Sequence, residues 1–242
     1  MPKKTILVGE DSGAHIGFLS DYFSDTKSIP IFAKTKEDVM DAFGMLNPDF
    51  VFMKIEWMDP KFVEQFQAYR KQKPAAKFFS IGYANDESFK WDNQFEAPLE
   101  LKTFRKKLLA EVNLPATINL LIVEDEKGIL ELFKDYFENQ NNPHFKVECA
   151  ENGLTGFQKL EKDPPHCIIL DIKMPIRSGI EFYGDLKKSN REIPVIVFLD
   201  STSPDEITQL RKYGTPVLIE KSGHQSSMPE MLGMIKKLVY FA

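Results

Sequence analysis

Three apolar runs in the second half of the chain each lead into side chains that could do chemistry. Residues 168–170 lead into Asp171, an earlier run leads into Glu124 and Asp125, and a later one leads into Lys221. Short apolar runs of this kind predict strands that are buried on both faces. In an open parallel α/β sheet the carboxyl ends of the strands share one crevice, so these groups would meet there. A carboxylate can act as a nucleophile, and cations beside it can neutralise the charge of a transferred group.

The residues that follow Asp171 form the specific pattern Asp-x-x-Met-Pro-x-x-x-Gly-x-Glu, which ends on Gly179 and Glu181. Taken alone, this pattern is also compatible with a carboxylate that caps a loop and a Met-Pro turn. With an acidic pair on one strand and a lysine on another, it resembles the receiver domain of two-component response regulators. The resemblance runs from about residue 116 to the C-terminus. In that family, the carboxylate after the third strand accepts a phosphoryl group from a histidine kinase.

The resemblance implies a Mg²⁺-dependent phosphoryl-transfer site. Asp171 would be the phosphoacceptor, and Lys221 would pair with it and then with the phosphoryl oxygens. Asp125 and Asp171 would bind Mg²⁺ directly, Glu124 would act through water, and the backbone carbonyl of Lys173 would be the third protein ligand. Mg²⁺ prefers oxygen ligands and keeps several waters, so this small set suffices. Without the other groups, the acidic pair would indicate only a solvated turn before a helix.

Two positions depart from the family pattern. Receivers carry Thr or Ser at the end of the fourth strand, where the register here places Leu199. A shift of one residue would offer Asp200, and a shift of two would offer Ser201. Many receivers also carry an aromatic residue on the fifth strand, where this chain has Leu218. We therefore expect an unusual route from the phosphate to the protein surface.

The first half of the chain repeats the plan of the second half without most of its chemistry. A strand-like run leads into Glu10 and Asp11, but Lys54 stands at the phosphoacceptor position and Ala97 at the position of the lysine. We expect a degenerate receiver in which the Lys54 ammonium pairs with the acids and takes the part of the metal. The alternative is that Lys54 points into solvent while the acids cap a helix. Between residues 81 and 95 there is little room for a full fourth helix.

The elements that must position these groups are strands alternating with helices, which predict βαβ units and parallel sheets. Ser178, Ser203 and Ser227 each precede a glutamate by three residues, a pattern typical of a capping box at a helix start. The resemblance implies two flavodoxin-like (CheY-like) doubly wound α/β domains, each with five parallel strands in the order 2-1-3-4-5. We expect residues 1–113 to form the degenerate receiver and residues 117–242 to form the receiver with the phosphoacceptor.

Composition excludes several classes of protein. The 242 residues carry a formal net charge of −5, which argues against a sequence-independent nucleic-acid binder. No apolar run approaches the ~20 residues of a membrane span. Cys149 and Cys167 both lie in apolar runs, and packed thiols suit a reducing compartment. We therefore expect a cytoplasmic protein that binds neither nucleic acid nor membrane.

The leading hypothesis is a response regulator without a DNA-binding or enzymatic output domain. It would accept a phosphoryl group on Asp171 and signal through protein contacts or a phosphorelay. It would not be an enzyme beyond self-catalysed phosphotransfer and dephosphorylation. The expected partners are a histidine kinase or phosphotransfer protein and an unknown downstream protein, and a homodimer stays open. The alternative is a phosphorylation-independent adaptor, which Leu199 and Leu218 favour.

Overall fold

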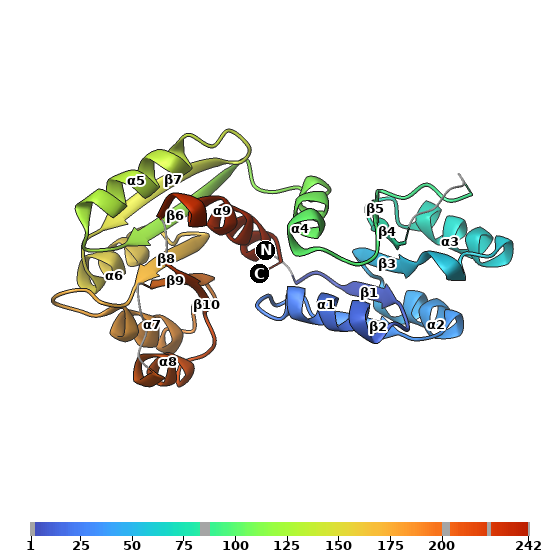
Figure 1. The fold of residues 1–242 in the computed structure, drawn as a ribbon, viewed down its shortest axis with the longest axis horizontal. Helices are drawn as coiled ribbons and strands as arrows, with labels where there is room; N and C mark the ends of the chain where they lie inside the picture. Colours follow the sequence, from blue (N-terminus) through green and yellow to red (C-terminus); the bar gives the residue numbers. More distant parts are fainter. Residues whose placement is uncertain (1–2, 83–87, 200–203, 222–223, 242) are drawn as a thin grey trace. The chain divides into compact units, whose positions relative to one another are not determined.

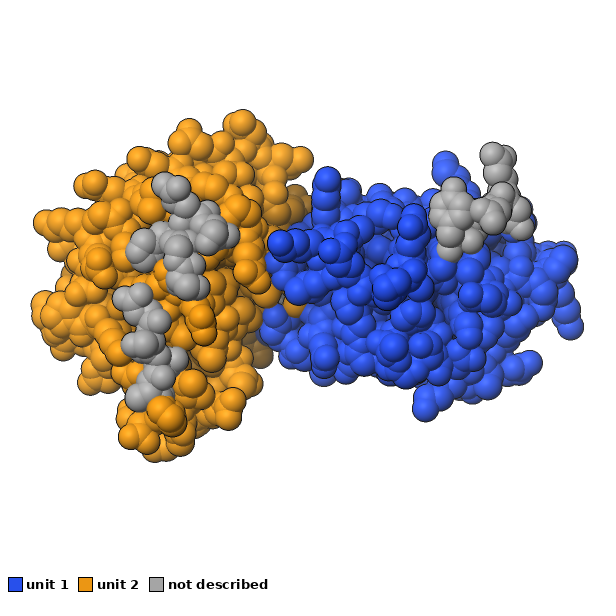
Figure 2. Space-filling view, viewed as in Figure 1, with its two compact units in different colours: residues 1–112, 241–242 blue, residues 113–240 orange. Residues whose placement is uncertain are grey.

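The chain folds into two compact units, traced in Figure 1 and coloured separately in Figure 2. The computed structural model describes residues 3–82, 88–199, 204–221 and 224–241. Unit 1 consists of Met1–Val112 with Phe241–Ala242, and unit 2 consists of Asn113–Tyr240. Within the described part of the chain, no helix has both the length and the apolar character needed to cross a membrane.

Unit 1 is built on a five-stranded parallel sheet. Its strands are β1 (Ile6–Gly9), β2 (Pro30–Ala33), β3 (Phe50–Lys54), β4 (Lys77–Ile81) and β5 (Asn93–Phe95). Its helices are α1 (Gly13–Phe23), α2 (Lys36–Leu46), α3 (Pro60–Gln72) and α4 (Leu101–Ala110), with a 3₁₀ turn η1 (Ile55–Trp57). The strand order β2-β1-β3-β4-β5 confirms the predicted flavodoxin-like order. Residues 82 and 88–92, which lie between β4 and β5, contain no helix, while residues 83–87 of this connection lie outside the described part of the chain.

Unit 2 repeats this topology with a full set of helices. Its strands are β6 (Thr117–Val123), β7 (His144–Ala150), β8 (Cys167–Asp171), β9 (Val195–Leu199) and β10 (Val217–Glu220). Its helices are α5 (Lys127–Glu138), α6 (Gly153–Lys162), α7 (Gly179–Lys188), α8 (Pro204–Arg211) and α9 (His224–Phe241). The order β7-β6-β8-β9-β10 is again 2-1-3-4-5 within the unit, and the paired strands are parallel.

Two apolar layers hold the sheet of unit 2. Along β8, Cys167 and Ile169 pack with residues of α5 and α9, whereas Ile168 and Leu170 pack with residues of α6 and α7. Successive side chains of a strand point to opposite faces, so a strand covered on both faces must be apolar throughout. The apolar run stops where β8 leaves these layers. Along β8 a polar side chain can therefore be accommodated at the end of the strand, and Asp171 is its last residue.

The capping-box predictions have different outcomes. Ser178 precedes α7, accepts a hydrogen bond from the Glu181 N–H, and forms the complete box. The box at Ser227 is wrong, because α9 already begins at His224 and contains Ser227 in its interior. Met228 and Met231, on one side of α9, are buried in the core of unit 2. Ser203, the third serine with this pattern, lies outside the described residues.

Candidate functional site

The carboxyl ends of β6, β8 and β10 bring the predicted site residues of unit 2 together. Glu124 and Asp125 follow β6, Asp171 is the last residue of β8, and Lys221 follows β10. Strands β6 and β8 are paired so that residue 123 lies opposite residue 170. The next residues along the two strands, Glu124 and Asp171, are therefore at the same level. Sheet register alone therefore places these side chains at one edge, where ligands of such folds bind.

Lys221 joins two of the carboxylates. Its Nζ lies 2.9 Å from Glu124 Oε2 and 3.1 Å from Asp171 Oδ1, and at most 4% of each of the three side chains is exposed. The ammonium also lies over the ring of Phe198, 5.5 Å from its centroid. Buried charges are costly unless they are paired, so the lysine is what makes two buried carboxylates tolerable here.

Burial dominates the protonation of this site. It raises the pKa of Glu124 to about 7; the negative charge of Asp171 acts in the same direction, while Lys221 opposes it. Burial also raises the pKa of Asp171, again against the effect of Lys221. For Lys221, burial lowers the pKa, but the two carboxylates outweigh it and the net shift is upward. The lysine is therefore charged at neutral pH, and the carboxylates around it outnumber it.

The carboxylates also form a set that fits a divalent cation. Glu124, Asp125 and Asp171 each offer an oxygen, and these oxygens lie within 4.8 Å of one another. No other cluster of three or more Asp, Glu, His or Cys side chains meets this criterion in the described residues. A set made only of carboxylate oxygens suits Mg²⁺. The Lys173 N–H donates to Asp171 Oδ2 at 3.0 Å, whereas the role of the Lys173 carbonyl as a ligand stays a prediction.

The loop after Asp171 gives a physical reason for the spacing of the sequence pattern. A Cβ on Gly179 would lie 2.0 Å from the main-chain oxygen of Asp171, so a larger residue does not fit without a shift of the backbone. Ser178 and Glu181 then cap α7. Ile176 in this loop is 80% exposed and has a φ of 70°, a region that β-branched residues rarely adopt. The pattern therefore folds the loop tightly onto the end of β8.

The two positions of unit 2 that depart from the family pattern hold Leu199 and Leu218 in the structure. Leu199 is the last residue of β9 and is 4% exposed, and its carbonyl accepts a hydrogen bond from the Lys221 N–H. Leu218 on β10 is 43% exposed. Asp200 and Ser201, the substitutes that a shift of register would offer, lie outside the described residues. No hydroxyl side chain is therefore placed at the end of β9 in the described part of the chain.

Unit 1 places Glu10, Asp11 and Lys54 at the corresponding edge of its sheet. The two acids follow β1, Lys54 ends β3, and the strands pair with residue 9 opposite residue 53. Lys54 Nζ lies 2.6 Å from Asp11 Oδ1, so the predicted pairing is confirmed and the solvent-facing alternative is wrong. The hydrogen bond between them raises the pKa of Lys54 and lowers the pKa of Asp11. Both groups are therefore charged at neutral pH.

His15 is a member of the unit 1 cluster that its sequence position does not suggest. Its Nδ1 lies 2.9 Å from Glu10 Oε2. The other carboxylate oxygen of Glu10 accepts hydrogen bonds from the N–H groups of Asp11 and Ser12, each at 2.9 Å. A lone histidine five residues after an acid is a weak signal, because the contact depends on how α1 leaves the sheet.

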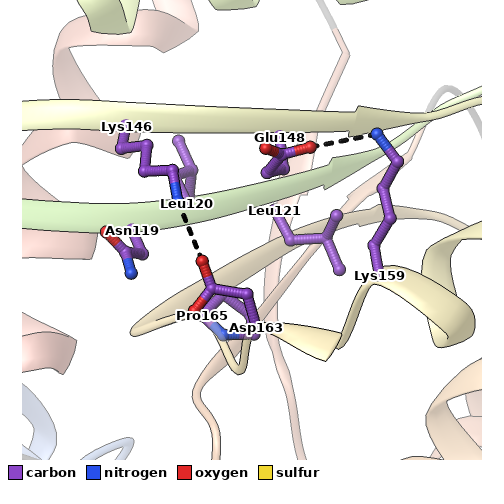
Figure 3. A pocket seen from close by; sticks show the side chains of 8 residues that line it. All are labelled: Asn119, Leu120, Leu121, Lys146, Glu148, Lys159, Asp163 and Pro165. Carbon is purple, nitrogen blue, oxygen red and sulfur yellow. Dashed lines mark hydrogen bonds and ion pairs between the residues drawn. The ribbon is translucent and has the colours of Figure 1, made fainter. Parts of the chain in front are cut away.

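A hollow between β6, β7 and α6 is not a second site (Figure 3). Its volume of about 10 Å³ leaves room for one water at most. Two ion pairs border it, Lys146 with Asp163 at 2.9 Å and Lys159 with Glu148 at 3.0 Å. Both pairs are about half exposed and link β7 to α6 or to the residue after it.

Comparisons with known proteins agree with this geometry. Residues 120–233 match the model of the response regulator receiver domain. Sporulation initiation phosphotransferase F of Bacillus subtilis is 30% identical over 95 residues, which is 39% of this chain and 74% of that protein. A protein-glutamate methylesterase/protein-glutamine glutaminase of Treponema denticola is 40% identical over 81 residues, 33% of this chain and 21% of that protein. The chain spans about half of the probable C4-dicarboxylate response regulator DctR of Bacillus subtilis.

Among solved structures, the response regulator domain of Thermotoga maritima CheB is 26% identical, with a TM-score of 0.46; the match covers 51% of this chain and 96% of that one. A probable two-component system response regulator/GGDEF domain protein matches 98% of this chain and 99% of its own at 13% identity, with a TM-score of 0.47. The family match runs from β6 into α9 and includes every strand end that carries the acidic cluster and Lys221. This chain therefore belongs to the response regulator receiver domain family of two-component systems.

Proposed function

We propose that unit 2 accepts a phosphoryl group on Asp171 in a Mg²⁺-dependent reaction, and that the chain signals through protein contacts or a phosphorelay. The donor would be a histidine kinase or a phosphotransfer protein. Residues 1–113 would form a degenerate receiver domain, and residues 117–242 the receiver with the phosphoacceptor. The observation that carries the proposal is the Lys221 ammonium, buried between Glu124 and Asp171 at the carboxyl edge of the sheet.

In the proposed step, a carboxylate oxygen of Asp171 attacks the phosphorus of a phosphohistidine. The bond from phosphorus to nitrogen breaks, and its electron pair stays on the imidazole nitrogen, which takes up a proton from solvent so that neutral histidine leaves. The product is a mixed anhydride on Asp171. The step needs an ionised carboxylate, and Lys221 favours that form against the burial that raises the pKa of Asp171.

Phosphoryl transfer depends mainly on positioning and on neutralising charge. Lys221 is 3.1 Å from Asp171 Oδ1, so its ammonium can follow the negative charge from the carboxylate to the phosphoryl oxygens. Bound Mg²⁺ would supply further positive charge next to the transferred group. The carboxylates of Glu124, Asp125 and Asp171 would hold it, because their oxygens already converge.

The test is to incubate the full chain with Mg²⁺ and acetyl phosphate and then to measure its intact mass. The native chain should gain one phosphoryl group. Asp171→Asn should gain none, because an amide is not a competent nucleophile. Asp163→Asn is the matched control, since Asp163 is exposed and paired with Lys146 away from the site, and it should be phosphorylated normally. Phosphorylation that persists in Asp171→Asn would refute the assignment.

A phosphorylation-independent adaptor with the receiver fold is the second candidate. The apolar Leu199 at the end of β9 favours it, because the hydroxyl that usually binds the phosphoryl group is missing from that position. The same mass measurement separates the two functions. A native chain that is folded and binds Mg²⁺, yet stays unmodified by acetyl phosphate and by a phosphorylated histidine phosphotransfer protein, would support the adaptor.

A further inference from the structure

Both units place one ammonium among the acids at the carboxyl edge of the sheet, but from different strands. In unit 2 it belongs to Lys221, which follows the edge strand β10. In unit 1 it belongs to Lys54, the last residue of the central strand β3, while Ala97 follows the edge strand β5. The cation of unit 1 therefore comes from the third strand of its own sheet, whose counterpart in unit 2 is β8, the strand that ends on Asp171.

The acids of unit 1 are already satisfied by the protein itself. Glu10 is fully buried, and its two oxygens are engaged by the N–H groups of Asp11 and Ser12 and by His15. Asp11 is half exposed, and its Oδ1 lies 2.6 Å from Lys54 Nζ. Asp11 is thus the carboxylate that a cation could still reach, and the chain itself supplies that cation as the Lys54 ammonium.

The unit 1 cluster also has fewer carboxylates for its one ammonium than the unit 2 cluster has. Unit 2 brings three carboxylates together and Lys221 pairs with two of them, whereas Glu10 and Asp11 act on Lys54 in unit 1. Exposed Glu56 adds only the weakest of the attractions that act on Lys54. A metal ion entering unit 1 would have to displace the lysine or lie close to a like charge, which costs free energy.

We propose that the Lys54 ammonium occupies the place of a divalent cation in unit 1. The native chain then binds Mg²⁺ in unit 2 alone, and unit 1 stays in one state whatever the metal concentration. Replacing this lysine by aspartate should open a second Mg²⁺ site, because a third carboxylate then joins Glu10 and Asp11. The proposal concerns unit 1 and does not depend on phosphorylation of unit 2.

The test uses the full chain, titrated with MgCl₂ in a calorimeter while tryptophan emission is recorded. The chain has two tryptophans, Trp57 and Trp91, and both lie in unit 1. Trp57 belongs to the turn η1 directly after Lys54, so its emission reports on this site. The native chain should bind one Mg²⁺ without a change in emission. Lys54→Asp should bind two, with an emission change that saturates.

Asp125→Asn separates the two units. In this background the number of bound Mg²⁺ ions should fall to zero, and adding Lys54→Asp should restore one together with the emission change. If unit 2 binds no metal at all, the native chain gives zero sites while Lys54→Asp still gives one. Failure of the proposed function and failure of this inference therefore give different results.

Two outcomes of the titrations of the native and Lys54→Asp chains would overturn the inference. One is a saturable, Mg²⁺-dependent emission change in the native chain, and the other is a folded Lys54→Asp chain that binds no metal in unit 1. If Lys54→Asp does not fold by circular dichroism, Lys54→Met removes the ammonium alone and should make the emission respond to Mg²⁺. Lys36→Met is its matched control, because it breaks another Lys–Asp pair of unit 1, with Asp59, and it should leave the emission unresponsive. A silent Lys54→Met chain would also overturn the inference.

Discussion

Replacing Gly179 by alanine tests whether the loop after Asp171 is held directly on the end of β8. The added Cβ would lie 2.0 Å from the Asp171 main-chain oxygen and 2.8 Å from the Ile172 Cα. Ordinary contacts of this kind begin at 3.4 Å. Both obstructing atoms belong to the backbone, so no side-chain rotation can relieve the clash. The loop must move away from the strand end that carries Asp171.

The expected cost follows from this overlap. Overpacking in a well-packed region typically costs about 1–3 kcal/mol, and a backbone obstruction favours the upper end. Alanine has a better helix propensity than glycine by up to about 1 kcal/mol, which offsets part of the cost at the start of α7. We therefore expect the free energy of unfolding to fall by about 2 kcal/mol. The Mg²⁺ affinity should also fall, because Asp171 moves with the loop.

Urea unfolding followed by far-UV circular dichroism measures the change in stability, and calorimetric titration measures the change in Mg²⁺ affinity. With a urea dependence of about 1–3 kcal/mol per molar, the midpoint of unit 2 should drop by roughly 1 M. Gly128→Ala is the matched control, because a Cβ there meets nothing within 4 Å on α5 of the same unit. The control should unfold at the native midpoint or slightly above it. A Gly179→Ala chain as stable as this control, with native Mg²⁺ affinity, would refute the reasoning.

Three further predictions address the charges and the switch. Glu124 has a pKa of about 7 in the folded chain, above its ordinary value, so the folded chain binds this proton more tightly than the unfolded chain does. The stability gained from this proton is full below the ordinary pKa and is lost as the pH rises through 7. Glu124→Gln should therefore weaken the fall of the urea midpoint over this range in metal-free buffer, and an equally steep fall would contradict the assignment. Beryllium trifluoride with Mg²⁺ should shift few NMR signals along α8 and β10, because Leu199 has no hydroxyl, and Leu199→Thr should increase the response. Large concerted shifts in the native chain would show that another residue takes the part of the hydroxyl. Asp163→Asn should leave the urea midpoint unchanged, since its pair with Lys146 is about half exposed, and a clear drop would show that this pair stabilises α6.

The sequence predicted the strand order through its resemblance to the receiver family, and it named the acids and the lysine of both clusters. Each charged residue of unit 2 directly follows or ends an apolar run, and parallel strands present their carboxyl ends at one edge. A parallel sheet with these runs in the predicted order therefore brings Glu124, Asp171 and Lys221 to one part of that edge. The pairing of Lys54 with Asp11 followed from the same rule, because the two residues end neighbouring strands of unit 1.

The tertiary structure alone decided features that depend on packing between distant elements. Ser227 carries a local helix-start signal, but α9 already begins at His224, and Met228 and Met231 of this helix pack in the core of unit 2. His15 meets Glu10 only because α1 leaves the sheet in the direction that its buried side sets. Spacing along the chain encodes the direction of side chains within one helix or strand, whereas contacts between elements depend on how their faces pack. For that reason the sequence could name the acids and the lysine, and the structure was needed to show which of them touch.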